Sequence, residues 1–101
     1  MAIVYALFPE AEMAKMVARC ILSERLAACA NILAPCISIY EWDGAVQDNA
    51  EVPMLFKTRG DLTQALIARI SELHSYDLPA ILTWPTEATA AFSSWVNEQT
   101  K

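Results

Sequence analysis

Residues 36–58 read CISIYEWDGAVQDNAEVPMLFKT, and this stretch decides the predicted fold. Asp43-Gly44 lies between two runs rich in β-branched and aromatic residues, which is the strongest short signal of a two-residue hairpin loop. With that loop, Cys36 on the first strand faces Glu51 on the return strand, which runs from residue 45 to residue 58. Proline cannot donate to the strand ladder, so Pro35 and Pro53 together predict a bend or bulge at one height.

The segments on both sides of the hairpin predict one helix and one outer strand each. Residues 2–8 are a short apolar run that favours a strand buried on both faces, and residues 11–28 show helical spacing. The first hairpin strand belongs to a β-rich stretch over residues 29–42. After the hairpin, Gly60-Asp61 opens a second helix with Asp61 as the expected N-cap. A last strand is expected over residues 80–84 and a short helix over residues 88–98.

The predicted order is therefore β-α-β-β-α-β with a helical tail. It indicates an α+β, ferredoxin-like fold with an antiparallel sheet, built as a single domain over residues 1–101. In that fold both main helices cover one face of the sheet. The short C-terminal helix is too small to cover the other face, so self-association is expected there.

Composition supports the same expectation of an oligomer. The chain has 101 residues, of which 55% are hydrophobic and 19% are charged. Ordinary domains carry roughly 25% charged residues, and a domain of this size buries only about two thirds of its extended surface. The surplus of apolar side chains therefore needs a partner surface.

Charge and cysteine content narrow the class of protein. The net charge is −5 and no basic run is present, which argues against nucleic acid and against an anionic membrane as partners. No apolar run approaches the roughly 20 residues that span a bilayer. Three cysteines at irregular spacing make no disulfide framework, and free thiols suit a reducing compartment. A soluble, cytoplasmic protein is expected.

Several stretches in the right order along nearly the whole chain resemble the CutA family of divalent-cation tolerance proteins. Two positions depart from the family pattern, since Ser75 replaces a proline and Ala80 replaces a glutamate. The matching stretches are ERLAACANI at 24–32, YEWDGAV at 40–46, Glu51-Val52 with FKT at 56–58, LHSYDLP at 73–79, and Trp95. The resemblance implies a ferredoxin-like subunit in a compact homotrimer, a link to divalent metals, copper above all, and no settled enzymatic activity.

Three residues are candidate metal ligands. The resemblance gives Cys29 a ligand role, and a thiolate suits Cu(I), whereas the imidazole of His74 suits copper or zinc. Glu51 offers a hard oxygen. Each also has a structural interpretation: Cys29 as a packed residue, His74 as a residue at a helix C-terminus, and Glu51 as a solvated charge. The three lie far apart in sequence and can meet only in the fold.

Other interpretations remain open. Cys36 faces Glu51 and could share a metal with it. Trimeric packing of this fold is similar to that of the PII signalling proteins, so Arg25, Lys57 or Arg59 could hold a small anion between subunits. A scaffold trimer without a ligand is the third possibility.

Catalysis is not expected. No glycine-rich phosphate loop or nucleophile elbow is present, and a Cys29–His74 pair is the one conceivable nucleophile and base. Aromatic side chains at Tyr40, Trp42, Trp84 and Trp95 are interpreted as interface or core anchors in preference to a ligand cage.

Overall fold

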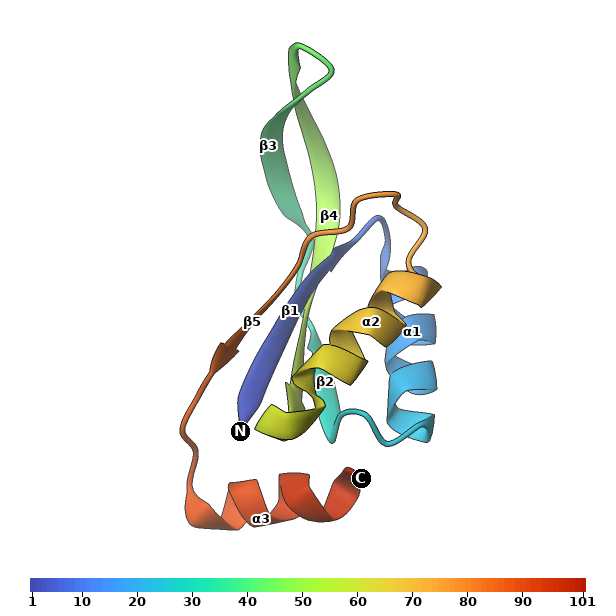
Figure 1. Cartoon of the computed structure of the whole chain (residues 1–101). Helices are drawn as coiled ribbons and strands as arrows, with labels where there is room; N and C mark the ends of the chain where they lie inside the picture. Colours follow the sequence, from blue (N-terminus) through green and yellow to red (C-terminus); the bar gives the residue numbers. More distant parts are fainter.

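The computed structural model describes the whole chain, residues 1–101, as five strands and three α-helices (Figure 1). A single 3-10 turn, η1, precedes the second helix. The elements in chain order are β1 Ala2–Phe8, α1 Ala11–Ser23, β2 Cys29–Ile32, β3 Cys36–Trp42, β4 Ala45–Thr58, η1 Gly60–Leu62, α2 Thr63–Leu73, β5 Ile81–Pro85 and α3 Ala90–Gln99. No helix is long and apolar enough to cross a membrane.

The strands form one antiparallel sheet in the order β2-β4-β1-β5, and β3 pairs only with the far half of β4. α1 and α2 lie together on one side of this sheet, and the β3–β4 hairpin projects beyond its end (Figure 1). The molecule is consequently elongated, with extents of 46 × 23 × 22 Å. The predicted α+β class and antiparallel sheet are confirmed.

The hairpin has the predicted loop and register. Cys36 pairs with Glu51, and Trp42 pairs with Ala45 beside the turn. Asp43 and Gly44 have φ angles of 57° and 80°, the left-handed conformation that a type I′ turn requires at both central positions. The predicted interruption is present as well, since residues 33–35 belong to no strand and the register of β2 against β4 is shifted by one residue from that of β3.

The core lies between the helices and one face of the sheet. Val4, Ala6 and Phe8 of β1 point into it and are fully buried, as are Met54 and Phe56 of β4. The intervening residues of β1 are only half-buried. The prediction that residues 2–8 are buried on both faces is therefore wrong for the single chain, because no element of the chain covers the second face.

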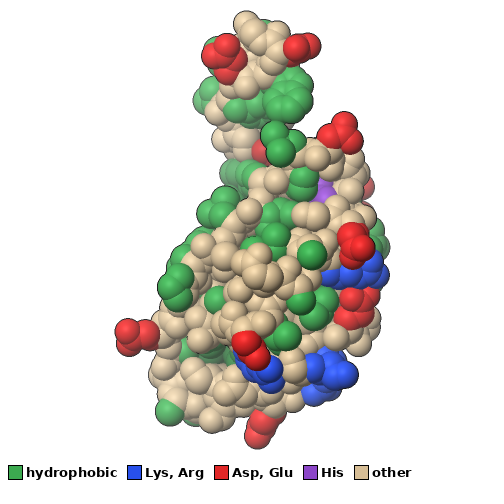
Figure 2. All heavy atoms as spheres, in the orientation of Figure 1, with side chains coloured by type: hydrophobic (Ala, Val, Ile, Leu, Met, Phe, Trp, Pro, Cys, Tyr) green, Lys and Arg blue, Asp and Glu red, His purple; other side chains and the backbone are tan.

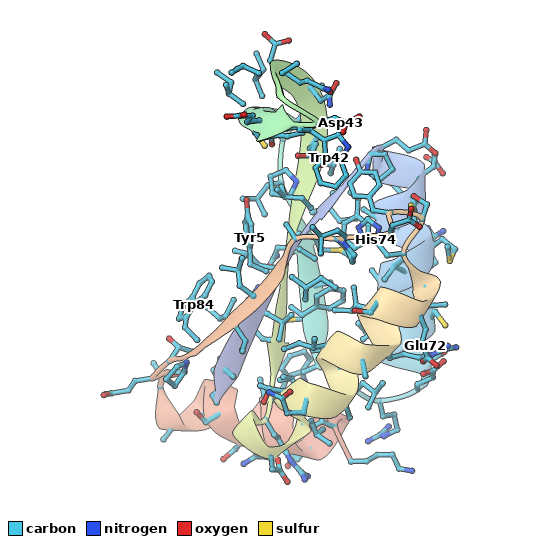
Figure 3. The ribbon with its side chains drawn as sticks, turned by 45° about the horizontal axis from the view of Figure 1, so that its top comes forward. Tyr5, Trp42, Asp43, Glu72, His74 and Trp84 are labelled. Carbon is cyan, nitrogen blue, oxygen red and sulfur yellow. The ribbon has the colours of Figure 1, made fainter.

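This second face is called the open face below. It carries the alternate residues of the central strands together with their partners on the edge strands. Figure 3 shows Tyr5 and Trp84 on the side of the sheet away from α1 and α2. α3 lies across the end of the sheet opposite the hairpin and leaves the open face uncovered (Figure 1). The members of the open face include Ile3, Tyr5, Leu7, Leu55, Leu82 and Trp84.

α1 ends earlier than predicted, at Ser23 and not near residue 28. The Leu26 amide donates to the Ile21 carbonyl and the Arg25 amide to the Leu22 carbonyl, which is the Schellman pattern that stops a helix. Arg25 holds the left-handed position of that motif, with φ 60°, although it is not a glycine. Its guanidinium donates to the Glu98 carbonyl at 2.8 Å and so ties this turn to the end of α3.

Asp61 does not cap the second helix, so that prediction is wrong. Its carboxylate accepts two hydrogen bonds from Arg59, at 3.0 and 2.7 Å. These bonds hold the pKa of Asp61 below its ordinary value. The chain enters α2 through the 3-10 turn, where the Thr63 hydroxyl donates to the Gly60 carbonyl.

Candidate functional site

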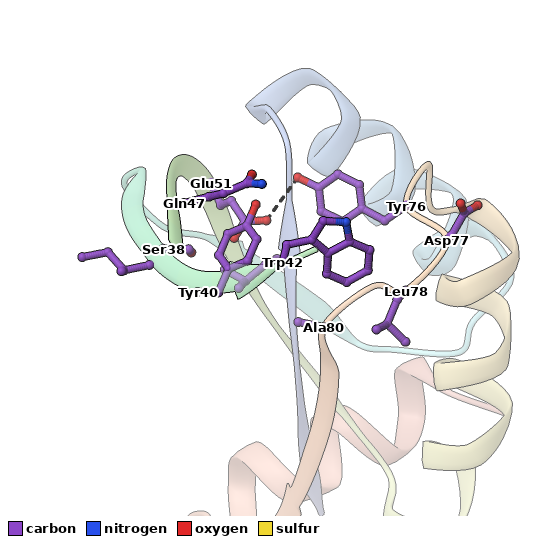
Figure 4. A pocket seen from close by; sticks show the side chains of 11 residues that line it. Ser38, Tyr40, Trp42, Gln47, Glu51, Tyr76, Asp77, Leu78 and Ala80 are labelled. Carbon is purple, nitrogen blue, oxygen red and sulfur yellow. Dashed lines mark hydrogen bonds between the residues drawn. The ribbon is translucent and has the colours of Figure 1, made fainter. Parts of the chain in front are cut away.

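Glu51 is the most enclosed acidic side chain of the protein, with 8% of its surface exposed. It lies on β4 at the base of the projecting hairpin, opposite Cys36. The Tyr76 hydroxyl donates to Glu51 Oε2 at 3.1 Å (Figure 4). A residue of the loop between α2 and β5 therefore reaches across to the hairpin and holds this carboxylate.

His74 is the first residue of the same loop. Its ring stacks on Phe8 with centroids 4.7 Å apart. Nδ1 accepts from the Tyr76 amide at 3.1 Å, so Nε2 carries the proton and donates to the Leu7 carbonyl at 2.7 Å. Both ring nitrogens are thus engaged, and a metal at either one would have to replace a hydrogen bond.

Tyr76 connects these two groups and stays protonated over a wide range of pH. Burial, and next the hydrogen bond to Glu51, raise the pKa of Tyr76 to about 12. Tyr5 on the open face has a raised pKa too, through burial and then through the charges of Cys36 and Glu51. The carboxylate therefore has two neutral phenols near it, of which Tyr76 donates a hydrogen bond to it.

Cys29 is remote from this cluster. It pairs with Lys57, which is six positions from Glu51 along β4, or about 20 Å of extended strand. The structure brings Glu51 and His74 into contact with one residue, Tyr76, and leaves Cys29 at the other end of the sheet. No group of three or more His, Cys, Asp or Glu side chains is arranged to hold a metal ion.

The cysteine beside Glu51 is Cys36, as the predicted hairpin register required. Its thiol lies 4.0 Å from the Ser38 hydroxyl and is half-buried. Cys20, the third thiol, lies on α1 within hydrogen-bonding distance of Glu24 and Arg69. All three cysteines are free.

The three candidate anion-binding residues differ in the interactions that their side chains already make. Arg25 is bonded to the end of α3 and Arg59 to Asp61. Lys57 has no ion pair and no side-chain hydrogen bond, and its register position places it on the open face beside Cys29 and Ile3. Lys57 is the one of the three whose side chain makes neither a hydrogen bond nor an ion pair.

A pocket of about 570 Å³ lies between the hairpin and the loop after α2 (Figure 4). Tyr40 and Trp42 line it, whereas Trp84 lies on the open face and Trp95 packs near Phe92 within α3. The four aromatic residues therefore do not form one cage. The full lining is Leu7, Ser38, Ile39, Tyr40, Trp42, Gln47, Glu51, Tyr76, Asp77, Leu78 and Ala80.

Comparison with known proteins identifies the family of this chain. The family model of the CutA1 divalent ion tolerance protein matches residues 2–99. The chain belongs to the CutA1 family. It is 42% identical to the divalent-cation tolerance protein CutA of Pyrococcus horikoshii, over all of this chain and 99% of that protein. It is 37% identical to the protein of the same name from Thermus thermophilus, over 91% of this chain and 90% of that one.

Solved CutA1 structures share the fold along the whole chain. The crystal structure of Pyrococcus horikoshii CutA1 has a TM-score of 0.95 at 40% identity and covers 100% of this chain and 99% of that one. Ehrlichia chaffeensis CutA1 gives 0.94 at 37% identity, with 99% and 94% covered. Against the chloroplastic CutA of Arabidopsis thaliana, the chain spans only 55% of the relative's length.

Within this CutA1 chain, sequence reasoning found Glu51, its facing Cys36 and His74, but gave Tyr76 no role. The only signal for Tyr76 was its place in the segment LHSYDLP, two residues after the histidine. Its role arises because the loop folds back onto the hairpin, a contact between residues 25 positions apart. No spacing rule would have indicated it.

Proposed function

We propose that this CutA1-family chain is a homotrimeric, ferredoxin-like protein that binds divalent metal, with copper as the expected ion, in the response to metal ions. The family's link to divalent-cation tolerance supports the metal. The strand order β2-β4-β1-β5 supports the ferredoxin-like description of a single domain over residues 1–101.

The open face and the hairpin are the observation that carries the proposal. Leu82 on the open face is 50% exposed, and Ile37, Ile39 and Val46 on the hairpin are 72–74% exposed. Exposed apolar surface on this scale marks an interface, and a closed ring of identical copies buries it without leaving an edge. Light scattering at micromolar concentration should give about three times 11.2 kDa. A stable monomer at that concentration would refute the trimer.

Assembly also determines whether the three candidate metal ligands can come together. One chain holds Cys29 about 20 Å of strand away from Glu51, so a site that uses Cys29, Glu51 and His74 together requires more than one copy. A mixed set of one thiolate, one carboxylate and one imidazole is able to bind copper.

Copper titration tests the ligand set directly. Isothermal titration of the purified protein is compared with Cys29→Ala, Glu51→Gln and His74→Ala, and Cys20→Ala serves as the matched thiol control. Each of the three changes should weaken copper binding, and the control should not. Equal copper affinity in all variants would contradict the assignment of these three ligands, provided that each variant keeps the parent's oligomeric mass.

A second candidate function rests on Lys57, the one of the three cations considered whose side chain makes no hydrogen bond or ion pair. In a trimer of PII type, this side chain on the open face would hold a small anion between subunits. A thermal-shift screen with nucleotides and anionic metabolites separates the two functions. A clear metal shift with no anion shift rejects the second function, and no shift with either class favours a ligand-free scaffold trimer.

The remaining proposals concern activity and location. We infer a non-enzymatic protein, in keeping with a family named for tolerance. The three free thiols favour the cytoplasm. The CutA of Archaeoglobus fulgidus, 30% identical in its solved structure, is described as periplasmic. Cell fractionation decides the location of this chain, and recovery outside the cytoplasm would overturn the inference.

A further inference from the structure

Glu51 is an almost buried carboxylate without a cationic partner. None of the four ion pairs of the protein includes it, and its only hydrogen bond is the one that Tyr76 makes to Oε2. Every buried side-chain oxygen has a hydrogen-bond partner, so Oε1, which has none, is accessible. Since Glu51 lines the pocket, this oxygen is available to a ligand there.

Three aromatic side chains share that pocket with the carboxylate. Tyr40 and Trp42 come from the hairpin and Tyr76 from the loop across the pocket, and Figure 4 shows Trp42 between Tyr76 and the side chains of Tyr40 and Glu51. In the single chain all three keep more than a third of their surface exposed, Trp42 the most at 54%. Aromatic faces attract a cation through the cation–π interaction, and the carboxylate attracts it through its charge, so the two effects add.

The only other charged residue of the lining is also acidic. Asp77 adds a second acidic residue, and no lysine, arginine or histidine lines the pocket. On the face seen in Figure 2, the Lys and Arg side chains lie towards the end away from the hairpin, and acidic side chains mark the hairpin tip. An anion would therefore find no positive group in this pocket.

An organic cation fits these groups better than a bare metal ion does. The pocket contains no three-residue set of metal ligands, and Leu7, Leu78 and Ala80 add apolar surface. Its volume of about 570 Å³ lies within the range of roughly 300–1,000 Å³ of small-molecule sites. We propose that this pocket binds a small organic cation, a protonated amine on an apolar or aromatic body. The ammonium group contacts Glu51 Oε1 and the body lies against Trp42.

This site shares Glu51 with the proposed metal ligands, but it uses neither Cys29 nor His74. The test therefore contains a chelator, which keeps metal away from Glu51, so that binding of the organic cation and binding of metal are measured separately. The three tryptophans provide an internal control, because only Trp42 lines the pocket, while Trp84 and Trp95 lie elsewhere.

The experiment follows the tryptophan indole N–H signals of the ¹⁵N-labelled full chain by NMR. The probes are phenylethylamine, which is cationic, phenylethanol, which is neutral, and phenylpropionate, which is anionic. Phenylethylamine should shift the Trp42 signal with a Kd of roughly 0.1–1 mM, and the other two probes should bind at least about tenfold more weakly. Signals of Trp84 and Trp95 should stay in place.

Two variants identify the groups. Glu51→Gln keeps the shape of the side chain and an acceptor for Tyr76, and it should weaken phenylethylamine binding at least about tenfold. Asp48→Asn, the same change of charge on the outer part of the hairpin and outside the pocket, should leave binding unchanged. Trp42→Leu leaves Glu51 in place and should also weaken phenylethylamine binding. Because this variant lacks the Trp42 signal, its binding is measured by titration calorimetry.

The proposal is overturned if phenylethanol binds as tightly as phenylethylamine, or if Asp48→Asn weakens binding as much as Glu51→Gln. It is equally overturned if no probe moves the Trp42 signal, because the pocket is then closed in the protein as it exists in solution.

Discussion

The two faces of the sheet differ strongly in how far their side chains are buried within one chain. On the helix-covered face, Val4, Ala6, Met54 and Phe56 have no exposed surface at all. On the open face, apolar side chains as large as Leu82 and Trp84 keep 50% and 40% of theirs exposed. The strands that supply both faces are the same, so apolar sequence alone does not bury a residue. Burial depends on whether another layer exists to cover the face.

The largest expected effect comes from the covered face. Phe56→Ala should lower the free energy of unfolding by about 3–5 kcal/mol, because it removes a fully buried ring and leaves a cavity. Met16→Ala on the exposed side of α1, where 48% of the side chain is exposed, should change it by less than about 1 kcal/mol. Guanidinium unfolding at one protein concentration gives both values. Equal losses would show that the two positions are not packed differently.

The next largest effect tests the open face. Leu82→Lys should abolish assembly, because it places an unpaired charge in the proposed interface. Met16→Lys is the matched control, since Met16 has a similar exposed fraction in the helix layer. Light scattering should give the mass of a single chain for the first variant and of a trimer for the second. An intact trimer with Leu82→Lys would assign the interface to another surface.

A smaller effect concerns Tyr76, whose pKa is raised to about 12. The folded state favours its neutral phenol, so its contribution to stability is complete below the unfolded pKa of roughly 10 and is lost as the pH rises through the folded value. Phenolate absorbance should show one titration near pH 12 that is absent in Tyr76→Phe. Glu51→Gln should shift this titration to lower pH, and an unchanged value would contradict the role given to Glu51.

The smallest effect is expected at the surface, where Arg69 of α2 donates three hydrogen bonds to Glu24 at the end of α1. These bonds lower the pKa of Glu24, so the contribution is present at neutral pH and is lost as the pH falls through that lowered pKa. Arg69→Gln should reduce the melting temperature slightly at low salt, and the difference should shrink in molar salt. A difference that is independent of salt would indicate packing of the arginine stem instead.

Much of the fold could be predicted because its signals are local. Asp43-Gly44 fixes a two-residue turn, and the turn fixes the register that places Cys36 opposite Glu51. The interruption at Pro35 follows from a missing donor in the same ladder. The end of α1 was harder, because Arg25 occupies a left-handed position where the sequence offers no glycine. The cap at Asp61 failed because Arg59, two residues away, competes for its carboxylate.

The residues of the candidate site also divide into those that the sequence could predict and those that it could not. Glu51 and His74 could be named from residue type and motif, but their common neighbour could not. Tyr76 contacts both because a loop closes over the base of the hairpin. Cys29 was grouped with them in sequence reasoning, yet the length of β4 keeps it at the far end of the sheet.

By itself, the sequence determined the order of strands and helices, the hairpin and its register, and the surplus of apolar residues, since each depends on neighbouring residues or on composition. Only the tertiary structure decided which apolar face is covered, that Cys29 is remote from Glu51, and how an acidic, aromatic pocket forms at the base of the hairpin. Those features depend on contacts between segments far apart in the chain, and such contacts are set by packing in three dimensions.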